Sequence, residues 1–178
     1  MLIARKESER TAFTLIELVT VMVILGIVAI VVAGPTLSLL DSMRSSAAAA
    51  RLTADIRYTQ RVALGSGLRT WVSFDATTEQ YSLFVEDPAN PGKANRVAAV
   101  NPLDLTTNAV QFGSGPFANV GISSVDINST TELEFDSFGE PYDANGVALT
   151  SAGTVVLTGN VAVQVSPVGG LVESVTWP

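Results

Sequence analysis

The sequence predicts an α+β protein in which one long N-terminal α-helix precedes a head of antiparallel strands. Residues 13–64 combine an apolar run with a stretch rich in helix-forming residues, and Gly65, Ser66 and Gly67 then favour a helix stop. Beyond Arg69, short runs rich in valine, threonine and aromatic residues alternate with turn residues, which is typical of strands. The length of 178 residues fits about one domain.

Composition narrows the range of functions. The chain has neither cysteine nor histidine, which excludes thiolate and imidazole metal ligands, cysteine nucleophiles and Ser-His-Asp triads. We therefore expect no enzyme, because carboxylates without a recognisable second catalytic group define no reaction. The formal net charge of −7 repels a phosphate backbone, so we also expect no nucleic-acid partner.

The charges are distributed unevenly along the chain. Residues 1–12 hold three of the ten basic side chains and two of the 17 acidic ones, and no basic residue follows Arg96. The C-terminal part is therefore purely acidic. We interpret this as an acidic surface that keeps an exported head soluble, with a specific cation or partner site as the alternative.

Residues 13–34 form the apolar run, which has one charge, Glu17, in 22 residues. A helix of this length, at about 1.5 Å per residue, crosses a hydrocarbon core of roughly 30 Å. A cleaved secretory signal is the alternative, although its apolar part is usually only about 7 to 15 residues long. Because basic residues precede the run, we expect a single-pass protein with residues 1–12 in the cytoplasm and the chain after about Pro35 outside.

Glu17 is unusual within this run. An ionised carboxylate at the centre of a bilayer costs roughly 2.5 to 3.5 kcal/mol unless it is paired. The run contains no basic residue, so the partner would be another chain, a lipid headgroup or an amino terminus created by proteolysis. The alternative is that Glu17, one turn from the start of the run, is solvated at the interface.

Residues 12–19 read AFTLIELV. This string resembles the prepilin peptidase recognition site of type IV pilins and type II secretion pseudopilins. The resemblance implies that a membrane aspartyl peptidase, which is also an N-methyltransferase, cuts between Ala12 and Phe13 and methylates the Phe13 amine. An alkylated amine keeps its positive charge. The family usually has glycine where this chain has Ala12, so we expect cleavage of lower efficiency.

The resemblance also implies a partner for Glu17. In pilus-like filaments this glutamate is thought to neutralise the N-terminal amine of the adjacent subunit, which pairs Glu17 with Phe13 of a neighbour. Such a pair within a helical bundle would set the axial register of assembly. Gly26 and Pro35 lie near positions where helices of this family loosen or kink.

Residues 35–64 are expected to continue the helix as an amphipathic stalk. Its apolar side is predicted to contain Leu37, Leu40, Ala47, Leu52, Ile56 and Ala63. The charged residues are expected to lie largely elsewhere: Asp41, Arg44, Arg51, Asp55, Arg57 and Arg61. We interpret the arginines as a solvated side of the helix, with specific subunit contacts as the alternative.

The strands of the head are predicted from short apolar runs. Residues 70–74 and 80–85 are expected to form a hairpin, and residues 87–95 an exposed loop. Residues 154–158, 161–165 and 171–176 are expected to form a closing three-strand meander, with Gly159 and Asn160 as the turn between its first two strands. Further strands are expected at 96–100, 109–112, 125–127 and 131–135.

Residues 54–84 and 133–141 resemble the GspH/FimT type of minor pseudopilin or minor pilin, which implies a pilin-like fold. Residues 18–21, LVTV, are similar to minor pilins of mannose-sensitive haemagglutinin-type systems, so the choice between a secretion machine and a pilus stays open.

Two further functions are alternatives. A minor pilin that binds DNA for uptake would need basic residues on the head. A calcium site would draw on the oxygen ligands of Asp136, Glu140, Asp143 and Asn145, although such residues are common in ordinary turns. No other cofactor is expected.

These inferences give a leader at residues 1–12, a transmembrane helix at 13–34, a stalk at 35–64 and a periplasmic head at 65–178. By resemblance, the chain is a minor subunit that primes or caps a filament at the bacterial inner membrane. Its expected partners are other pilins or pseudopilins, through the N-terminal helix, and the prepilin peptidase. Its position in the filament stays open.

Overall fold

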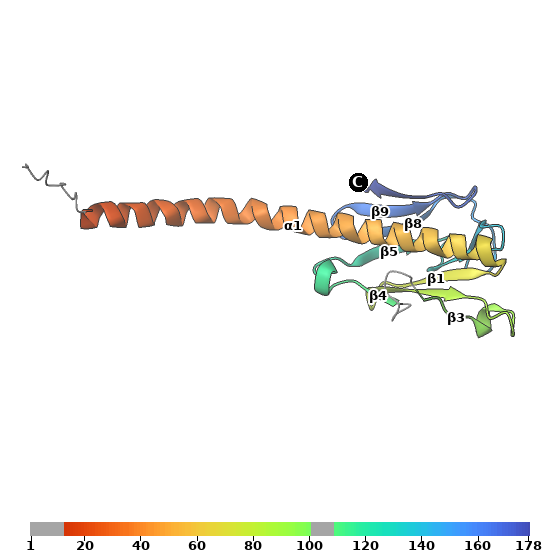
Figure 1. Cartoon of the computed structure of the whole chain (residues 1–178). Coiled ribbons are helices and arrows are strands. Elements are labelled where there is room, and N and C mark those ends of the chain that lie inside the picture. Colours follow the sequence, from red (N-terminus) through yellow and green to blue (C-terminus); the bar gives the residue numbers. More distant parts are fainter. Residues whose placement is uncertain (1–12, 101–108) are drawn as a thin grey trace, which may run out of the picture. The chain divides into compact units, whose positions relative to one another are not determined.

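The computed structural model describes residues 13–100 and 109–178, without the side chains of residues 31–38. The predicted leader, including Ala12, lies outside the described residues. Within them the chain forms one α-helix, two short 3-10 helices and two antiparallel sheets (Figure 1). The α+β class and the antiparallel head are therefore confirmed.

Helix α1 (Leu15–Ser66) covers both segments that were predicted to be helical. It ends as predicted, because Gly67 adopts a φ of 70° and donates its N–H to the carbonyl of Ala63 at 2.9 Å. The helix is continuous through Gly26 and Pro35, and a kink there stays a prediction. The chain divides into two compact units, Met1–Leu39 and Leu40–Pro178.

The head contains two sheets. The first has the order β3-β2-β1-β6-β7, with β4 also paired to β2, and the second has the order β10-β9-β8-β5. The strands of the first sheet are β1 (Thr70–Asp75), β2 (Gln80–Val85), β3 (Val97–Ala98), β4 (Ala109–Gln111), β6 (Glu132–Phe135) and β7 (Pro141–Asp143). Those of the second are β5 (Ile122–Asp126), β8 (Gly153–Leu157), β9 (Val161–Val165) and β10 (Val172–Thr176). The 3-10 helices are η1 (Lys93–Asn95) and η2 (Gly115–Phe117).

The predicted hairpins are confirmed. Strands β1 and β2 pair antiparallel, and β8, β9 and β10 form the closing meander, with Gly159 and Asn160 both at positive φ in the turn. The prediction for β5 was wrong, because this strand begins at Ile122, three residues before the predicted start. Strand β3 is shorter than expected, and β7 was missed because a three-residue strand that starts with Pro141 has no recognisable apolar pattern.

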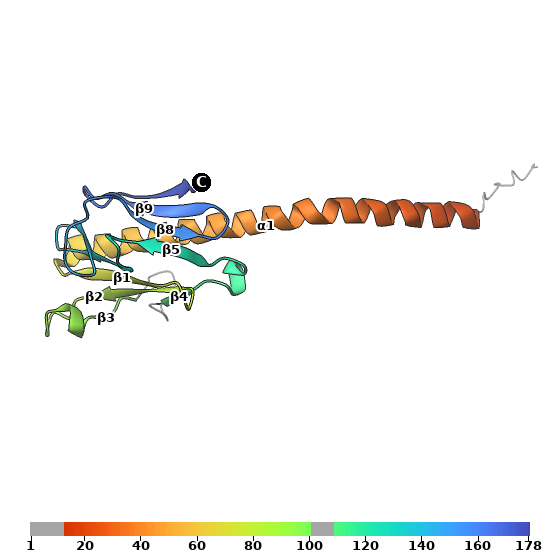
Figure 2. The same ribbon diagram turned by 180° about the vertical axis from the view of Figure 1, so that it is seen from behind.

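One core joins α1 to both sheets. The sheets lie as two layers, and the C-terminal part of α1 runs along them (Figure 1, Figure 2). The helix contributes five fully buried apolar side chains to this core, namely Ala48, Ala49, Leu52, Ile56 and Ala63. Tyr81 and Phe112 stack with neighbouring rings in the layer of the first sheet.

The predicted faces of the stalk need two corrections. Leu40 and Ala47 are exposed, because the buried face of α1 starts at Ser45 and then follows positions 48, 49, 52 and 56. Asp55 was assigned to the solvated side but is only 1% exposed. The side chain of Leu37 is not described.

Asp55 is buried because the head supplies donors for its carboxylate. Its Oδ2 accepts hydrogen bonds from the hydroxyl of Tyr81 at 2.6 Å and from Nε of Arg51 at 2.9 Å. Burial raises the pKa of Tyr81 above its usual range, and the adjacent Asp55 carboxylate raises it further, so the hydroxyl stays protonated as a donor. This contact joins the helix to β2.

We predict that Asp55→Ala lowers the free energy of unfolding by about 3 kcal/mol, because it leaves the Tyr81 hydroxyl and part of the Arg51 charge without a buried partner. The measurement is urea-induced unfolding of the full chain, followed by the fluorescence of its tryptophans. The control Glu173→Ala changes an exposed side chain of β10 and should alter the free energy by less than about 0.5 kcal/mol. Equal effects of the two substitutions would contradict a structural role for Asp55.

Candidate assembly site

The start of α1 is capped by Thr14. The backbone N–H of Glu17 donates to Oγ1 of Thr14 at 3.3 Å and to its carbonyl at 3.1 Å, and the N–H of Leu18 donates to the same carbonyl at 3.2 Å. Glu17 therefore lies in the first turn, where a carboxylate is favoured by the positive end of the helix dipole.

Our interpretation of the sequence missed this second role of Glu17. The signal was present, because a threonine three residues before a glutamate at the start of an apolar run is the capping-box pattern. Glu17 thus has a reason to occupy this position even without a partner from another chain. Any test of subunit pairing must separate the two roles.

The N-terminal part of α1 is apolar on all sides. From Phe13 to Ile30, 13 large apolar side chains are exposed within the described residues. A helix that is apolar all round has no preferred face for water, and soluble monomers rarely expose apolar patches of this extent. This segment therefore requires an apolar environment that its own chain does not supply among the described residues.

Phe13 itself precedes the helix and is 77% exposed. The predicted cleavage follows Ala12, which lies outside the described residues, so the geometry of that peptide bond is not described. Of the helices in the described residues, none combines the length and the apolarity needed to cross a membrane.

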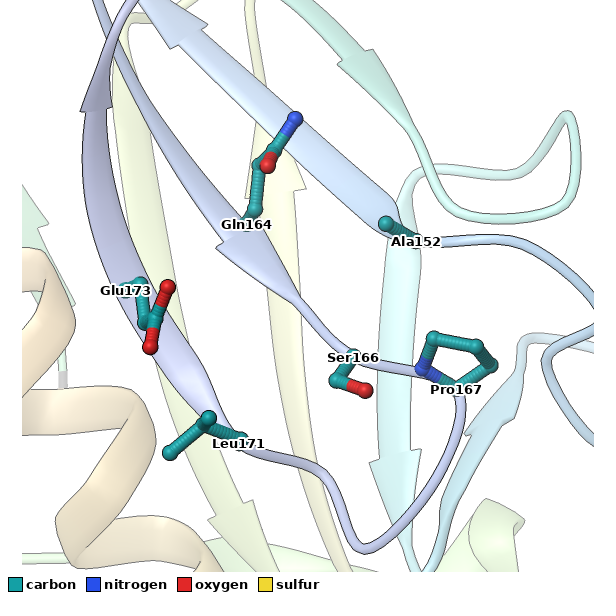
Figure 3. A pocket seen from close by; sticks show the side chains of 6 residues that line it. All are labelled: Ala152, Gln164, Ser166, Pro167, Leu171 and Glu173. Carbon is teal, nitrogen blue, oxygen red and sulfur yellow. The ribbon is translucent and has the colours of Figure 1, made fainter.

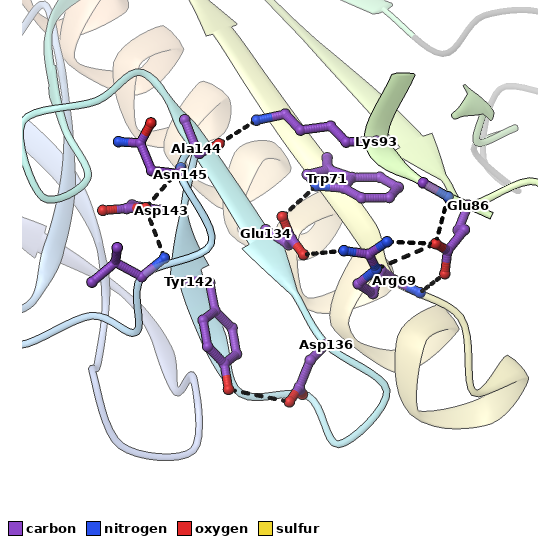
Figure 4. Close-up of polar contacts among 12 residues, drawn as sticks. Arg69, Trp71, Glu86, Lys93, Glu134, Asp136, Tyr142, Asp143, Ala144 and Asn145 are labelled. Carbon is purple, nitrogen blue, oxygen red and sulfur yellow. Dashed lines mark hydrogen bonds and ion pairs between the residues drawn. The ribbon is translucent and has the colours of Figure 1, made fainter. Parts of the chain in front are cut away.

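The head neutralises its buried carboxylates internally. Glu86 accepts from Nη2 of Arg69 at 2.7 Å and from the backbone N–H of Gly92 at 2.9 Å, while Nη1 of Arg69 lies 3.5 Å from Glu134 (Figure 4). Glu134 also accepts from Nε1 of the fully buried Trp71 at 2.7 Å. The pKa of Glu86 lies below its usual value, mainly because Arg69 donates a hydrogen bond to its carboxylate.

Glu132 is neutralised in the same way. It lies 2.5 Å from Nη1 of Arg96 and also contacts Nζ of Lys93. The guanidinium of Arg96 lies over the rings of Phe84, at 4.2 Å, and Trp71, at 5.9 Å. The acidic C-terminal part is therefore more than a solubilising surface, because Glu132 holds the loop after β2 against the first sheet and Glu134 pairs with Arg69, which directly precedes β1.

The calcium candidates act as turn residues. Oδ1 of Asp136 accepts two backbone N–H groups of its own turn, both at 2.9 Å, and Oδ1 of Asp143 accepts two more, at 2.8 and 3.0 Å. Asn145 contributes its backbone N–H to the second set. Within residues 13–100 and 109–178, no three Asp or Glu residues are grouped to hold a metal ion. Backbone capping accounts for these residues.

A small depression of about 140 Å³ lies on the second sheet. Figure 3 shows its lining side chains, which are Ala152, Gln164, Ser166, Pro167, Leu171 and Glu173. These groups include one carboxylate and no neighbouring base or nucleophile pair, so they form no arrangement for a reaction that we can name.

We predict that Glu86→Gln makes stability less dependent on pH in the acid range. Because the folded pKa of Glu86 is lower than the unfolded one, its contribution is present above the unfolded pKa and is lost as the pH falls through the folded pKa. The wild-type chain should therefore lose more unfolding free energy between about pH 6 and pH 3 than the variant does. Urea titrations at both pH values measure this, and equal losses in the two proteins would contradict it.

Comparison with known proteins identifies the fold. The sequence matches no protein-family model and no curated protein. Two solved structures of the minor pseudopilin EpsH from the type 2 secretion system of Vibrio cholerae are similar to the chain, each with a TM-score of 0.54. The first is 14% identical and the match covers 75% of this chain and 97% of EpsH; for the second the values are 13%, 77% and 96%. This chain therefore has the pilin-like fold of a minor pseudopilin.

Proposed function

We propose that the chain is a minor pseudopilin or minor pilin, a structural subunit of a type II secretion pseudopilus or a type IV pilus-like filament. The observation that carries this proposal is the exposed, wholly apolar start of α1, with Glu17 as its one charge, on a chain with a pilin-like fold. A bundle of such helices supplies the apolar environment that a single chain lacks.

Before assembly, the same segment anchors the precursor in the bacterial inner membrane. The support is in the sequence, where the basic residues of positions 1–12 precede the 22-residue run with a single charge. In this proposal the leader stays in the cytoplasm, the head is periplasmic, and a prepilin peptidase cuts before Phe13 and methylates its amine.

Glu17 then pairs with the Phe13 amine of an adjacent subunit. Within a water-poor bundle either charge alone would be heavily penalised, so the pair forms only when the helices lie in the correct axial register. Its position in the first turn leaves the carboxylate exposed in the described chain and free to reach another subunit. The pair would thus select register more than it would add stability.

A priming or capping role follows from the same proposal. The solved structures with a similar fold are described as a minor pseudopilin, and we propose that this chain likewise acts at the start or the end of a filament. DNA capture has less support, because five of the seven basic residues after Phe13 already form ion pairs with carboxylates of the chain.

The first test is processing. We predict that the chain, expressed in membranes together with a prepilin peptidase, loses residues 1–12 and gains one methyl group on Phe13. Intact-mass spectrometry with N-terminal peptide mapping measures both changes, and expression without the peptidase is the control. Residues 1–12 still present on the chain after expression with the active enzyme would overturn the processing step.

The second test separates pairing from helix capping. We predict that Glu17→Gln strongly reduces the incorporation of the processed chain into sheared filaments, because it removes the charge that pairs with an amine. The observed cap uses the backbone N–H of residue 17, which glutamine keeps, so the helix start is preserved. The matched variant Thr14→Ala weakens the cap by about 1 kcal/mol and keeps the charge, and it should assemble.

Quantitative immunoblotting of the filament and membrane fractions measures the result of the second test. The opposite pattern, with assembly of Glu17→Gln and failure of Thr14→Ala, would show that capping is the only role of Glu17. Membrane insertion should be unchanged in both variants, since neither substitution shortens the apolar run.

A further inference from the structure

Two arginines of α1 differ from the other cations of the processed chain. Seven basic residues follow Phe13, all of them described, and five form ion pairs. The paired ones are Arg44, Arg51, Arg69, Lys93 and Arg96. Arg57 and Arg61 have no carboxylate partner within the described residues, although acidic residues outnumber basic ones by about two to one.

Arg57 and Arg61 lie one helical turn apart. Arg57 donates from Nε and Nη2 to the carbonyl of Val172, at 3.2 and 2.6 Å, which holds its guanidinium beside β10. Among the described residues, Arg61 donates only from Nε, to the carbonyl of Arg57 at 3.2 Å. Most N–H donors of Arg61 and several of Arg57 are therefore available to an acceptor from outside.

Both arginines line one cleft of about 440 Å³, which we call the arginine cleft. Its lining residues are Arg57, Gln60, Arg61, Gly169, Leu171 and Val172. The cleft is braced, because Nε2 of Gln60 donates to the carbonyls of Gly139 and Gly169, both at 2.9 Å. Its wall opposite α1 is thus tied to the helix.

Exposed apolar side chains lie at or next to lining residues of the arginine cleft in the sequence. Leu171, which lines the cleft, directly precedes β10 and is labelled in Figure 3, is 57% exposed, and Val168, next to the lining residue Gly169, is 81% exposed. Leu64 and Phe138 are also exposed on the segments that Gln60 draws together. Two unpaired guanidinium groups beside exposed apolar side chains form the mixed surface that recurs at the centre of protein interfaces.

We propose that the arginine cleft receives an aspartate or glutamate side chain, with an apolar neighbour, from the head of a different subunit of the same filament. This inference rests on the proposed function, because it assumes that other pilin-like subunits adjoin the chain. The carboxylate accepts from Arg61 and from the free donors of Arg57, and the apolar neighbour packs on Leu171 and Val168.

A nucleic acid is a poorer occupant. From Leu40 onward the chain carries seven basic and 14 acidic residues, and Glu140 lies beside the cleft, where it accepts the N–H of Gly169 at 3.3 Å. The net negative charge of the head would repel a polyanion along its whole length, whereas a single carboxylate would enter between two guanidinium groups. A second copy of this chain is also disfavoured as the occupant, because two heads with the same net negative charge repel each other.

The test uses the full chain, co-expressed with the other subunits of its filament, with the photo-crosslinking residue p-benzoylphenylalanine in place of Val168. Arg61→Gln is the main variant, because in the part of the chain that the structure describes the Arg61 side chain bonds only within its own helix, so its loss should not disturb the head. Arg44→Gln, on the same helix but outside the cleft, is the matched control.

We expect an adduct with a different pilin-like subunit, mapped by mass spectrometry to a peptide that contains Asp or Glu. Arg61→Gln should lower the adduct yield about tenfold, the effect of losing one charge-assisted contact, and Arg44→Gln should not change it. Arg61→Glu should abolish the adduct, and the reciprocal change of the mapped acidic residue to lysine should restore it.

Three results would overturn the inference: an adduct yield unaffected by Arg61→Gln, an adduct with a second copy of the chain, or Arg61-dependent binding of a short DNA duplex in a fluorescence anisotropy assay. Wild-type chain that enters filaments but gives no adduct would overturn this inference alone. Failure of the wild-type chain to enter filaments would instead overturn the proposed function, and this inference with it.

Discussion

The buried face of α1 is the constraint on which the head depends, because both sheets complete their core against it. Ala48, Leu52 and Ile56 are fully buried on this face. Three polar contacts hold it in place: Tyr81 of the first sheet donates to Asp55, Arg57 donates to Val172 of the second, and Gln60 links two turns of the head. The helix therefore sets where the strands pack.

The same constraint explains how an acidic head tolerates buried charge. Glu132 and Glu134 lie on β6 and are nearly fully buried, which is costly unless each carboxylate is paired. Arg69, Lys93 and Arg96 meet that need, so these cations are used within the fold. Only cations without a structural carboxylate partner are available for another chain, which is why the two unpaired arginines on α1 carry more information than the net charge does.

The sequence predicted the elements whose signals are local. The Gly159 and Asn160 turn, the glycine stop after α1 and the first hairpin depend on backbone preferences and on alternation over a few residues. Asp55 could not be placed this way, because its burial depends on Tyr81, 26 residues later in the chain. Strand β7 likewise exists only because β6 offers it a partner. For the assembly site, Phe13 and Glu17 stood out in the sequence, whereas the arginine cleft needs contacts across more than 100 residues.

The capped start of α1 gives cleavage before Phe13 a physical consequence. Processing would create a charged amine one residue before Thr14, next to the end of α1 where the helix dipole is already positive. Glu17 in the first turn partly offsets this charge within its own chain, and a neighbouring Glu17 would offset it further in a bundle. The uncut chain has no such amine at this position. Cleavage, as proposed, would therefore add an electrostatic cost to the single subunit, and pairing with the Glu17 of a neighbour would relieve it.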